Sequence, residues 1–406
     1  MRSKKVFFTN QAGDRLAALL DTPVDNRPTS YAIIAHCFTC TKNIKAIHYI
    51  SRALTQRHIA VLRFDFTGLG ESGGDFSESN FSSNVADLLS AARYLETDHQ
   101  PAGILIGHSL GGTAALAAAS QIPSVKGVVT IGSPYEPHHV LHHFKKEQAE
   151  IAQHGEAEVE IGGQRYLMKQ QFLDDVQGVS MRSAIKELGC ALLVLHASND
   201  ETVTIDNAGK IFEAARHPKS FISLDDAGHL LAQQQDACYA GGLIASWAEK
   251  YLTEAESAPQ VARSDVETVA ASIGRERYYT EIDAHGHALV ADEPVAMGGA
   301  ELGPSPYDLL TAALGACTAM TLRMYADQKQ WPLDEVDVQL KHSKIHGKDC
   351  AECDDKQHKI DLITREITLT GALSDEQRQR LLEIADKCPV HRTLHAEVQV
   401  NTRLVS

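Results

Sequence analysis

A glycine-rich stretch around residue 109 carries the clearest chemical pattern in the sequence. The apolar residues 104–106 precede a Gly-x-Ser-x-Gly pattern in which Ser109 lies between Gly107 and Gly111, and small residues follow from Gly112. A sharp turn from a buried strand into a helix needs small residues where the two backbones nearly touch, and it exposes the serine hydroxyl above the sheet. We therefore predict that Ser109 is a nucleophile on such a turn.

Alternating strands and helices are expected to hold this turn. Apolar runs predict strands at 4–8, 15–20, 31–35, 60–64, 104–106, 127–131, 191–196 and 220–224. Helical spacing of apolar residues appears at 44–56 and 81–97. The first two strands read as a pair joined by a short turn. Strands that alternate with helices predict an α/β fold with a doubly wound, mostly parallel sheet.

Residues 1 to about 253 resemble the α/β-hydrolase family. The Gly-x-Ser-x-Gly turn is one match, and the order Ser109, Asp200, His229 along the chain is that of the family. The segment His36-Cys37-Phe38 resembles the family's His-Gly loop, with cysteine where glycine is usual, and residues 65–70 resemble its Asp-x-x-Gly-x-Gly loop.

Two residues after later strands are the predicted partners of the serine. Asp200 follows the strand at 191–196, and His229 follows the strand at 220–224. We expect His229 to take the proton of Ser109 while Asp200 orients the imidazole. Taken singly, each residue would be better interpreted as a helix-capping aspartate or a surface histidine, and the serine turn and the chain order favour the triad. Glu201 and Asp226 are the nearest alternatives for the acid.

The backbone near the serine is expected to hold the oxyanion. The resemblance implies one amide from Leu110 and a second from Cys37 or Phe38. Cys37 and Cys40 form a C-x-x-C pattern in the same loop. They are either a redox pair that regulates the hydrolase or two small residues packed behind the loop.

The strand rhythm stops between residues 133 and 189, where a lid is expected to gate the substrate. Residues 158–166 predict a hairpin that turns at Gly162 and Gly163. A histidine cluster precedes it, and its members lie one helical turn apart in pairs: His138, His139, His142 and His143. This spacing can bind a metal, but no third ligand is apparent, so a solvated helix near the cleft is the favoured interpretation.

Length and charge limit the classes of function. The chain has 406 residues, which predicts two domains, and its formal net charge of -15 disfavours a nucleic-acid or anionic-membrane partner. No apolar run approaches the length of a membrane span, and the N-terminus becomes polar too early for a signal peptide. We expect a cytoplasmic protein without a cofactor, whose eight cysteines serve thiol or metal chemistry or the core rather than structural disulfides.

A polar, aperiodic linker at 254–272 separates the hydrolase-like region from residues 273–406. In the second region we predict a hairpin around His285 and His287, and a buried apolar helix at 307–328. Further strands are predicted at 336–344, 360–370 and 397–404, and a helix at 375–387.

Residues 273–406 resemble the OsmC/Ohr family, which is α+β and forms intertwined dimers. The matching stretches are Gly303-Pro-Ser-Pro, Gly315-Ala-Cys317 and Lys387-Cys388-Pro-Val-His391. The resemblance implies a homodimer in which Cys317 reacts with an organic hydroperoxide and Cys388 resolves it as a disulfide, later reduced by a dithiol. Such a thiol needs a cation or a helix terminus to lower its pKa.

The sequence departs from the peroxidases of that family at the activating residues. Histidines 285 and 287 stand where the first hairpin usually carries an arginine, and Tyr307 beside Asp308 stands where a glutamate is usual. An arginine near Cys317 would be the stronger activator, because its charge does not depend on pH near neutrality. The candidates are Arg275, Arg277, Arg323 and Arg392.

A second C-x-x-C pattern pairs Cys350 with Cys353, close to His346. These residues are weak candidates for a zinc site, since the second cysteine pair of a zinc ribbon is missing. A redox pair or an uninvolved loop are the alternatives.

The sequence thus predicts a fusion of a serine hydrolase, acting on small-molecule acyl substrates such as esters, with an OsmC-like domain. Two other interpretations stay open. One is a non-catalytic dimeric scaffold, and the other is a thiol peroxidase with an accessory hydrolase.

Overall fold

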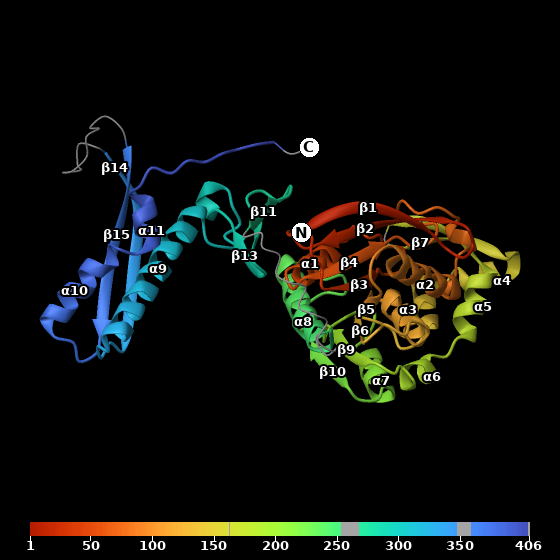
Figure 1. The fold of residues 1–406 in the computed structure, drawn as a ribbon. Coiled ribbons are helices and arrows are strands. Elements are labelled where there is room, and N and C mark those ends of the chain that lie inside the picture. The colour runs from red at the N-terminus through yellow and green to blue at the C-terminus, as the bar shows by residue number, and fades with distance from the viewer. Residues whose placement is uncertain (162, 253–267, 347–358, 405–406) are drawn as a thin grey trace. The chain divides into compact units, whose positions relative to one another are not determined.

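The computed structural model describes residues 1–161, 163–252, 268–346 and 359–404 (Figure 1). The chain divides into two compact units. The first comprises Met1–Ser272 and Asp283–Ala288, and the second comprises Ile273–Ile282 and Leu289–Ser406.

An eight-stranded sheet organises the first unit, in the order β1-β2-β4-β3-β5-β6-β9-β10. Its strands are β1 (Arg2–Thr9), β2 (Arg15–Thr22), β3 (Ser30–Ala35), β4 (Ile59–Phe64), β5 (Ala102–His108), β6 (Gly127–Ile131), β9 (Ala191–His196) and β10 (Lys219–Ser223). Strand β2 is antiparallel to both of its neighbours, β1 and β4, and the strands from β4 to β10 are parallel. This confirms the doubly wound, mostly parallel sheet predicted from the sequence.

Helices cover both faces of this sheet. Neighbouring residues of a strand point to opposite faces, so the central strands contribute apolar side chains to two buried clusters. Ala32 and Ile34 of β3 belong to one buried cluster with α1 (Lys45–Thr55) and α8 (Gln234–Leu252). Ile33 belongs to the other cluster. That second cluster includes residues of α2 (Phe81–Asp98), α3 (Leu110–Ala118) and α7 (Asp206–Ala214).

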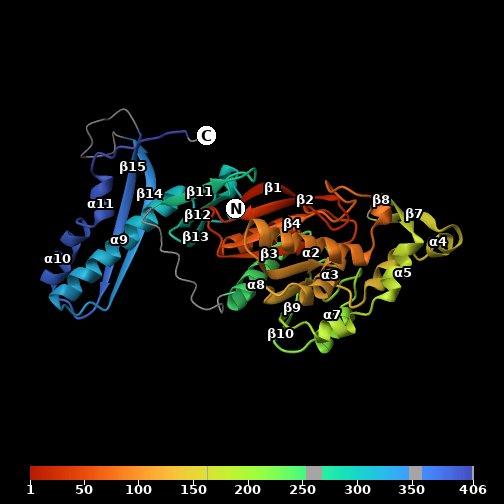
Figure 2. The ribbon, with the colours of Figure 1, turned by 45° about the vertical axis from the view of Figure 1, so that its right-hand side comes forward.

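The predicted lid region lies between β6 and β9 and has secondary structure of its own. It contains η3 (Pro137–Phe144), α4 (Gln148–His154), β7 (Glu156–Ile161), β8 (Gln164–Lys169), α5 (Gln170–Gly178) and α6 (Met181–Lys186). Figure 2 shows β7, β8, α4 and α5 gathered on one side of the first unit. The β7–β8 hairpin forms as expected. The histidine-rich segment is a 3-10 helix.

The second unit is built around one long helix. Its elements are β11 (Val269–Ile273), β12 (Thr280–Ala284), β13 (His287–Ala291), η4 (Val295–Met297), α9 (Pro306–Lys329), β14 (Glu335–His346), β15 (Lys359–Thr370), α10 (Asp375–Ala385) and α11 (Pro389–Leu394). The strands β11, β12 and β13 each have residues in both units, and Asp283 of β12 belongs to the first. Strands β11–β13 form one small sheet and β14–β15 another. A Ser305–Asp308 capping box begins α9, and Pro306 occupies its first turn.

Two expectations for this unit are wrong for the single chain. Helix α9 is not a buried helix, because only the stripe of Leu314, Thr318, Leu322 and Ala326 is buried. Residues 397–404 form no strand, since a strand needs a neighbour to accept its hydrogen bonds and the described chain offers none there. By length and composition α9 would also suit a membrane span, a test that core helices of water-soluble domains pass as well.

Candidate active site

Ser109 lies at the turn that the sequence predicted, between β5 and α3. It is the N-cap residue of α3 and has a positive φ of 53°, which is strained for a residue with a side chain. Its N–H donates to the carbonyl of Ile131 at 2.8 Å. A Cβ at Gly107 would lie 2.3 Å from the carbonyl oxygen of Gly111, so this crossing of strand and helix requires glycine.

Asp200 and His229 meet at the carboxyl edge of the sheet. Oδ2 of Asp200 accepts a hydrogen bond from Nδ1 of His229 at 2.7 Å. Oδ1 accepts the backbone N–H groups of Thr202 and Val203, each at 2.9 Å. Burial alone would raise the pKa of Asp200, but these hydrogen bonds outweigh it and hold the pKa below its usual range. The carboxylate is therefore ionised and fixes which nitrogen of His229 carries the proton.

The other predicted acids do not take this place. Among the described residues, neither Glu201 nor Asp226 has a hydrogen bond to His229. Ser109 Oγ and His229 share no hydrogen bond in the described part of the chain either. Such bonds are often long without substrate and shorten when it binds. The structure thus shows a direct hydrogen bond between the candidate acid and the candidate base. Among the described residues, the hydrogen bond between His229 and Ser109 is the one contact of the triad that is not formed.

Gly132 connects the serine to this pair, although the sequence pattern did not single it out. It follows Ile131, whose carbonyl binds the Ser109 amide, and it has a φ of +55°. A Cβ there would lie 3.3 Å from both Asp200 Oδ2 and His229 Nδ1. The turn after β6 therefore needs glycine to let the acid–base pair approach.

The predicted oxyanion loop packs against the start of α3. A Cβ at Gly111 would lie 2.4 Å from the carbonyl oxygen of His36, so the loop backbone and the helix start are in close contact. Leu110 is the first residue of α3, and the first N–H groups of a helix have no acceptor within it. The Cys37 carbonyl accepts the Cys40 N–H at 3.1 Å, which closes the loop into a turn.

Cys37 and Cys40 are joined by a disulfide, so they are not two packed thiols, and the expectation that the cysteines form no structural disulfide is wrong for this pair. Cys37 is buried and Cys40 is partly exposed. The bond closes the turn that carries the candidate oxyanion amides.

A buried lysine lies directly behind this loop, and sequence reasoning did not identify it. Lys42 Nζ pairs with Asp65 Oδ2 at 2.5 Å and with Glu71 Oε2 at 2.8 Å, although its side chain is only 1 % exposed. Hydrogen bonds from Lys42 and Lys5 lower the pKa of Glu71 to about 2. The ion pairs tie the oxyanion loop to the loop at 65–70, the second stretch that resembled the hydrolase family.

The lid contributes both histidines and aromatic rings to this region. Burial and the neighbouring imidazoles lower the pKa of His139 to about 4, and burial and His229 lower that of His143. These histidines belong to none of the possible metal-binding groups in the described residues. The hydroxyl of Tyr166 on β8 donates to the Thr39 carbonyl of the oxyanion loop at 3.3 Å. The ring of Phe38 lies 5.4 Å from that of Phe172 on α5.

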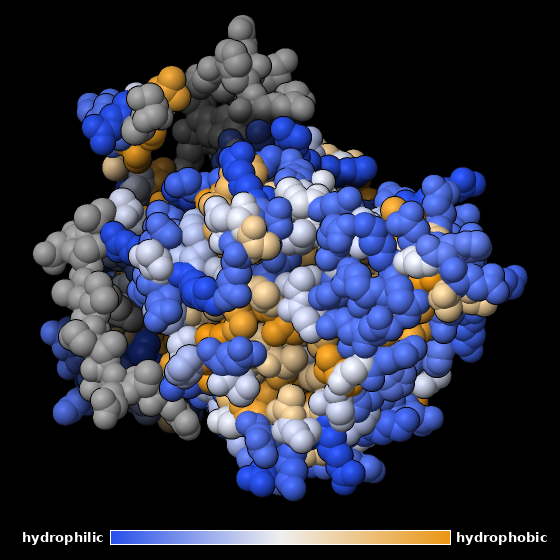
Figure 3. Space-filling view, turned by 90° about the vertical axis from the view of Figure 1, so that its right-hand side faces the viewer, coloured by the Kyte–Doolittle hydropathy of each residue, from blue (hydrophilic) through white to orange (hydrophobic). Residues whose placement is uncertain are grey.

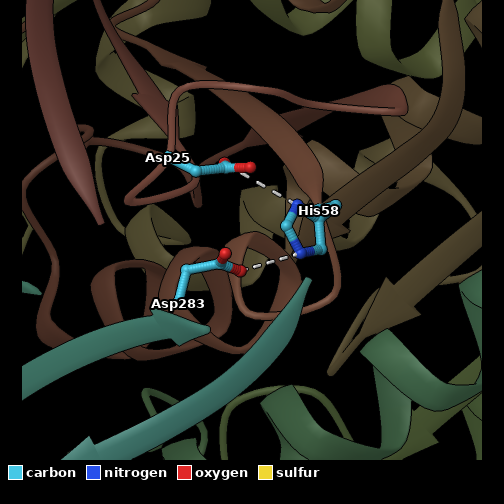
Figure 4. Close-up of side chains that lie close together, drawn as sticks. All are labelled: Asp25, His58 and Asp283. Carbon is cyan, nitrogen blue, oxygen red and sulfur yellow. Dashed lines mark ion pairs between the residues drawn. The ribbon is translucent and has the colours of Figure 1, made fainter. Parts of the chain in front are cut away.

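One group of potential metal ligands lies elsewhere in the first unit: Asp25, His58 and Asp283 (Figure 4). Nδ1 of His58 faces Asp25 at 3.8 Å and Nε2 faces Asp283 at 3.3 Å. Each ring nitrogen thus already faces its own carboxylate. These contacts do not call for a metal ion.

In the second unit, Cys317 and Cys388, the two cysteines of the expected peroxidase, are free thiols. Cys317 is partly exposed on α9, and Cys388 is buried at the N-terminus of α11. The hydroxyl of Thr318 lies 3.7 Å from Cys388 Sγ. The zinc candidates Cys350 and Cys353 lie outside the described residues, as does the side chain of His346.

Arg365, which was not among the predicted arginines, binds Thr318 and pairs with Asp386. Its Nη1 donates to Thr318 Oγ1 at 3.0 Å and to the Ala385 carbonyl at 3.1 Å. Arg323 is occupied elsewhere, since it donates to the carbonyls of Leu333 and Asp334. Arg365 lies on a strand distant from both cysteines in sequence, so only the fold reveals it.

Comparisons with known proteins find a matching family for each of the two units. The alpha/beta hydrolase family matches residues 32–240, and an OsmC-like protein family matches residues 298–403. The chain belongs to the α/β-hydrolase family. It is a fusion of a hydrolase domain with an OsmC-like domain, as predicted.

Among its relatives is the esterase domain of a Rhodothermus marinus protein. It is 45 % identical, and the match covers 62 % of this chain and 100 % of that chain with a TM-score of 0.52. Est1E from Butyrivibrio proteoclasticus, solved with ferulic acid, is 18 % identical over 61 % of this chain and 100 % of its own, with a TM-score of 0.52, and shares the fold. The uncharacterized protein YfhR of Salmonella typhimurium is 23 % identical over 56 % of this chain and 75 % of its own length.

Proposed function

We propose that the hydrolase domain cleaves ester or related acyl bonds by nucleophilic catalysis, with Ser109, His229 and Asp200 as its triad. The observation that carries the proposal is the Asp200–His229 hydrogen bond of 2.7 Å at the sheet edge beside the strained Ser109 turn. The esterase domain from Rhodothermus marinus, at 45 % identity, supports the same class of reaction.

The proposed reaction has two halves. His229 Nε2 takes the proton of Ser109 as Oγ attacks the acyl carbon, and Asp200 stabilises the imidazolium. The amides of Leu110 and of Cys37 or Phe38 hold the oxyanion. The imidazolium then protonates the departing alcohol, which leaves an acyl-enzyme. Water attacks this ester by the same steps and releases the acid and free Ser109.

The surface of the first unit supports a substrate with an apolar part. Figure 3 shows an apolar patch surrounded by polar side chains on the side where α4 and α5 lie. Contiguous apolar surface with a few polar groups is typical of a ligand site. We propose a small-molecule ester as substrate, with no cofactor, nucleic acid or membrane surface involved.

A fluorophosphonate probe tests the proposal directly. It should label wild-type protein at Ser109 and leave Ser109→Ala unlabelled, while Ser124→Ala, which removes a serine hydroxyl away from the turn, should label like wild type. A panel of 4-nitrophenyl esters, thioesters and anilides on the same proteins would define the acyl bond. Full ester turnover by Ser109→Ala refutes the triad, and the scaffold alternative then gains support.

For the OsmC-like domain we propose homodimerisation and, as a second activity, thiol-dependent peroxide reduction. The Cys317 thiolate would attack a hydroperoxide oxygen to give a sulfenic acid and an alcohol. The Cys388 thiol would then condense with it to a disulfide and water, and a dithiol would reduce the disulfide. The observation that favours this is the partly exposed Cys317, next in sequence to the Thr318 that binds Arg365.

Mass spectrometry after one equivalent of cumene hydroperoxide tests the peroxidase. We expect a Cys317–Cys388 disulfide in the wild type, none in Cys317→Ser, and an overoxidised Cys317 in Cys388→Ser. If both thiols remain reduced, the domain serves assembly or ligand binding instead.

A further inference from the structure

Three buried histidines lie around the candidate triad without belonging to it: His36, His108 and His196. We propose that they are positioning residues, each of which holds one loop of the site through a hydrogen bond from a neutral ring to a backbone carbonyl. This inference rests on the proposed serine hydrolase function and assigns roles that the triad itself does not include.

His108 holds the loop of the base. It precedes Ser109 at the end of β5, and its Nε2 lies 2.7 Å from the carbonyl oxygen of His229. Because the acceptor is a carbonyl, Nε2 carries the proton and donates. The two rings also lie 5.1 Å apart. A residue of the serine turn therefore fixes the backbone of the base.

His196 holds the loop of the acid. It ends β9, and its Nε2 donates to the carbonyl of Val203 at 2.7 Å. The N–H of Val203 in turn donates to Oδ1 of Asp200. Val203 thus accepts the hydrogen bond of His196 with its carbonyl and orients the Asp200 carboxylate with its N–H. Nδ1 of His196 is buried without a partner, so Nε2 accounts for the polar role of the ring.

His36 holds the oxyanion loop. Its Nε2 accepts the N–H of Phe66 at 3.3 Å, so the proton is on Nδ1, which donates to the Cys37 carbonyl at 2.8 Å. In a planar trans peptide the N–H points opposite to the C=O. Pinning the Cys37 carbonyl therefore sets the direction of the Phe38 N–H, and we assign Phe38 as the second oxyanion donor.

The charge state of the three rings agrees with these roles. Burial lowers the pKa of His36 and of His108 to about 4, and it also lowers the pKa of His196. All three are therefore neutral near pH 7, and each presents one donor. A neutral donor fixes a carbonyl without adding a charge that would compete with the developing imidazolium of His229.

Asparagine and glutamine substitutions separate positioning from simple packing. The glutamine amide nitrogen lies as many bonds from the backbone as the histidine Nε2, and the asparagine amide nitrogen corresponds to Nδ1. We expect His108→Gln and His196→Gln to keep kcat within about threefold, and His108→Asn and His196→Asn to lose on the order of 10- to 100-fold, the cost of a misplaced catalytic group.

For His36 the order should reverse. His36→Asn keeps the donor to the Cys37 carbonyl and should retain more kcat than His36→Gln, which loses it. Each variant gives up one of the two hydrogen bonds of the ring, so the pair is matched in polarity and in lost contacts. The reversal between His36 and the other two histidines is the signature that a merely structural role would not produce.

The readout is kcat and KM for 4-nitrophenyl butyrate on the full chain, with melting temperatures for all six variants. The proposal requires the losses to appear in kcat with KM nearly constant. Equal kcat for the asparagine and glutamine forms at each site, or losses confined to KM, would overturn it. Ser109→Ala on the same substrate tests the hydrolase function separately: if it is inactive while the substitution pattern fails, only the positioning roles are wrong. Should His108→Asn or His196→Asn not fold, the His36 pair and the nearly unchanged kcat required of His108→Gln and His196→Gln still decide.

Discussion

The two domains differ in how much of their candidate site lies within one chain. In the hydrolase domain, acid and base are in contact, and each loop of the site is held by groups of the same domain. Among the described residues of the OsmC-like domain, the buried apolar cluster is small and consists of Leu322, Ala326, Leu333, Leu381, Ile384 and Ala385. Met320 and Met324 of α9 are 66 % and 72 % exposed.

This difference shows what a single chain can specify. A close-packed core on both faces of the sheet fixes the loops at the edge of the sheet. The geometry of the hydrolase site is therefore set within its own domain. An isolated two-stranded hairpin is only marginally stable in water, and the helix α9 that packs on β14 and β15 here is itself largely exposed. In the homodimer that we propose, the exposed face of α9 and residues 397–404 would contact a second copy of this chain.

The largest effect expected from breaking the hydrolase side of this comparison follows from Asp200→Asn. The asparagine cannot hold the His229 tautomer as a carboxylate does, and kcat should fall by roughly 10⁴-fold, by analogy with the same change in other triads. Steady-state kinetics on an ester checks this. Glu201→Gln is the matched control and should behave like wild type. The acid is misassigned if the two results are exchanged.

Low pH should strongly destabilise the hydrolase domain. The pKa of His36 and of His108 is about 4 in the folded chain against 6.5 unfolded, so the unfolded state binds more protons between these values. Their stabilising contribution is present above pH 6.5 and is lost as the pH falls toward 4. Each site should then lower the free energy of unfolding by about 1.4 kcal/mol per pH unit.

Urea unfolding between pH 7 and 4.5 measures this slope. The chain has two tryptophans, Trp247 in the hydrolase domain and Trp331 in the OsmC-like domain, so Trp331→Phe leaves a reporter of the first alone. His108→Gln in that background should reduce the slope by about one proton. An unchanged slope would show that His108 is not kept neutral by burial.

Breaking the OsmC-like side should change assembly and leave hydrolysis intact. Replacing Met320 and Met324 together by lysine places two charges on the exposed face of α9, and the dimer dissociation constant should rise by about 100-fold or more. Sedimentation over a concentration series measures it. Met297→Lys, an equally exposed methionine outside α9, is the control. A chain that is monomeric before any substitution contradicts the dimer.

The smallest effect concerns the disulfide of the oxyanion loop. Replacing Cys37 and Cys40 by serine should lower kcat by less than about tenfold, because the Cys37 carbonyl keeps its hydrogen bonds to His36 and to the residue 40 amide. A dithiol should have the same effect on the wild type and none on the double variant. Cys190→Ser and Cys238→Ser control for the cysteines of this domain outside the disulfide. Complete inactivation would make the disulfide the main support of the loop.

Local patterns predicted the parts of the molecule that local contacts determine. The turn at Ser109 and the β7–β8 hairpin follow from residues close in sequence, whereas the order Ser109, Asp200, His229 came from the resemblance to the α/β-hydrolase family. The positions of Lys42, Gly132 and Arg365 could not be predicted, because their roles come from partners far away along the chain. The strand predicted at 397–404 does not form, for a related reason. Alternation of apolar and polar residues predicts a strand, but it does not say which neighbouring strand would pair with it.

The hydrogen bond from Tyr166 to Thr39 links two events that are usually considered apart. Tyr166 belongs to the lid hairpin and Thr39 to the turn that carries the candidate oxyanion amides. If the hairpin lifts to admit substrate, this bond breaks and the turn loses its outer restraint. Access and transition-state stabilisation would then favour different members of the conformational ensemble, and turnover would depend on how quickly the hairpin closes again.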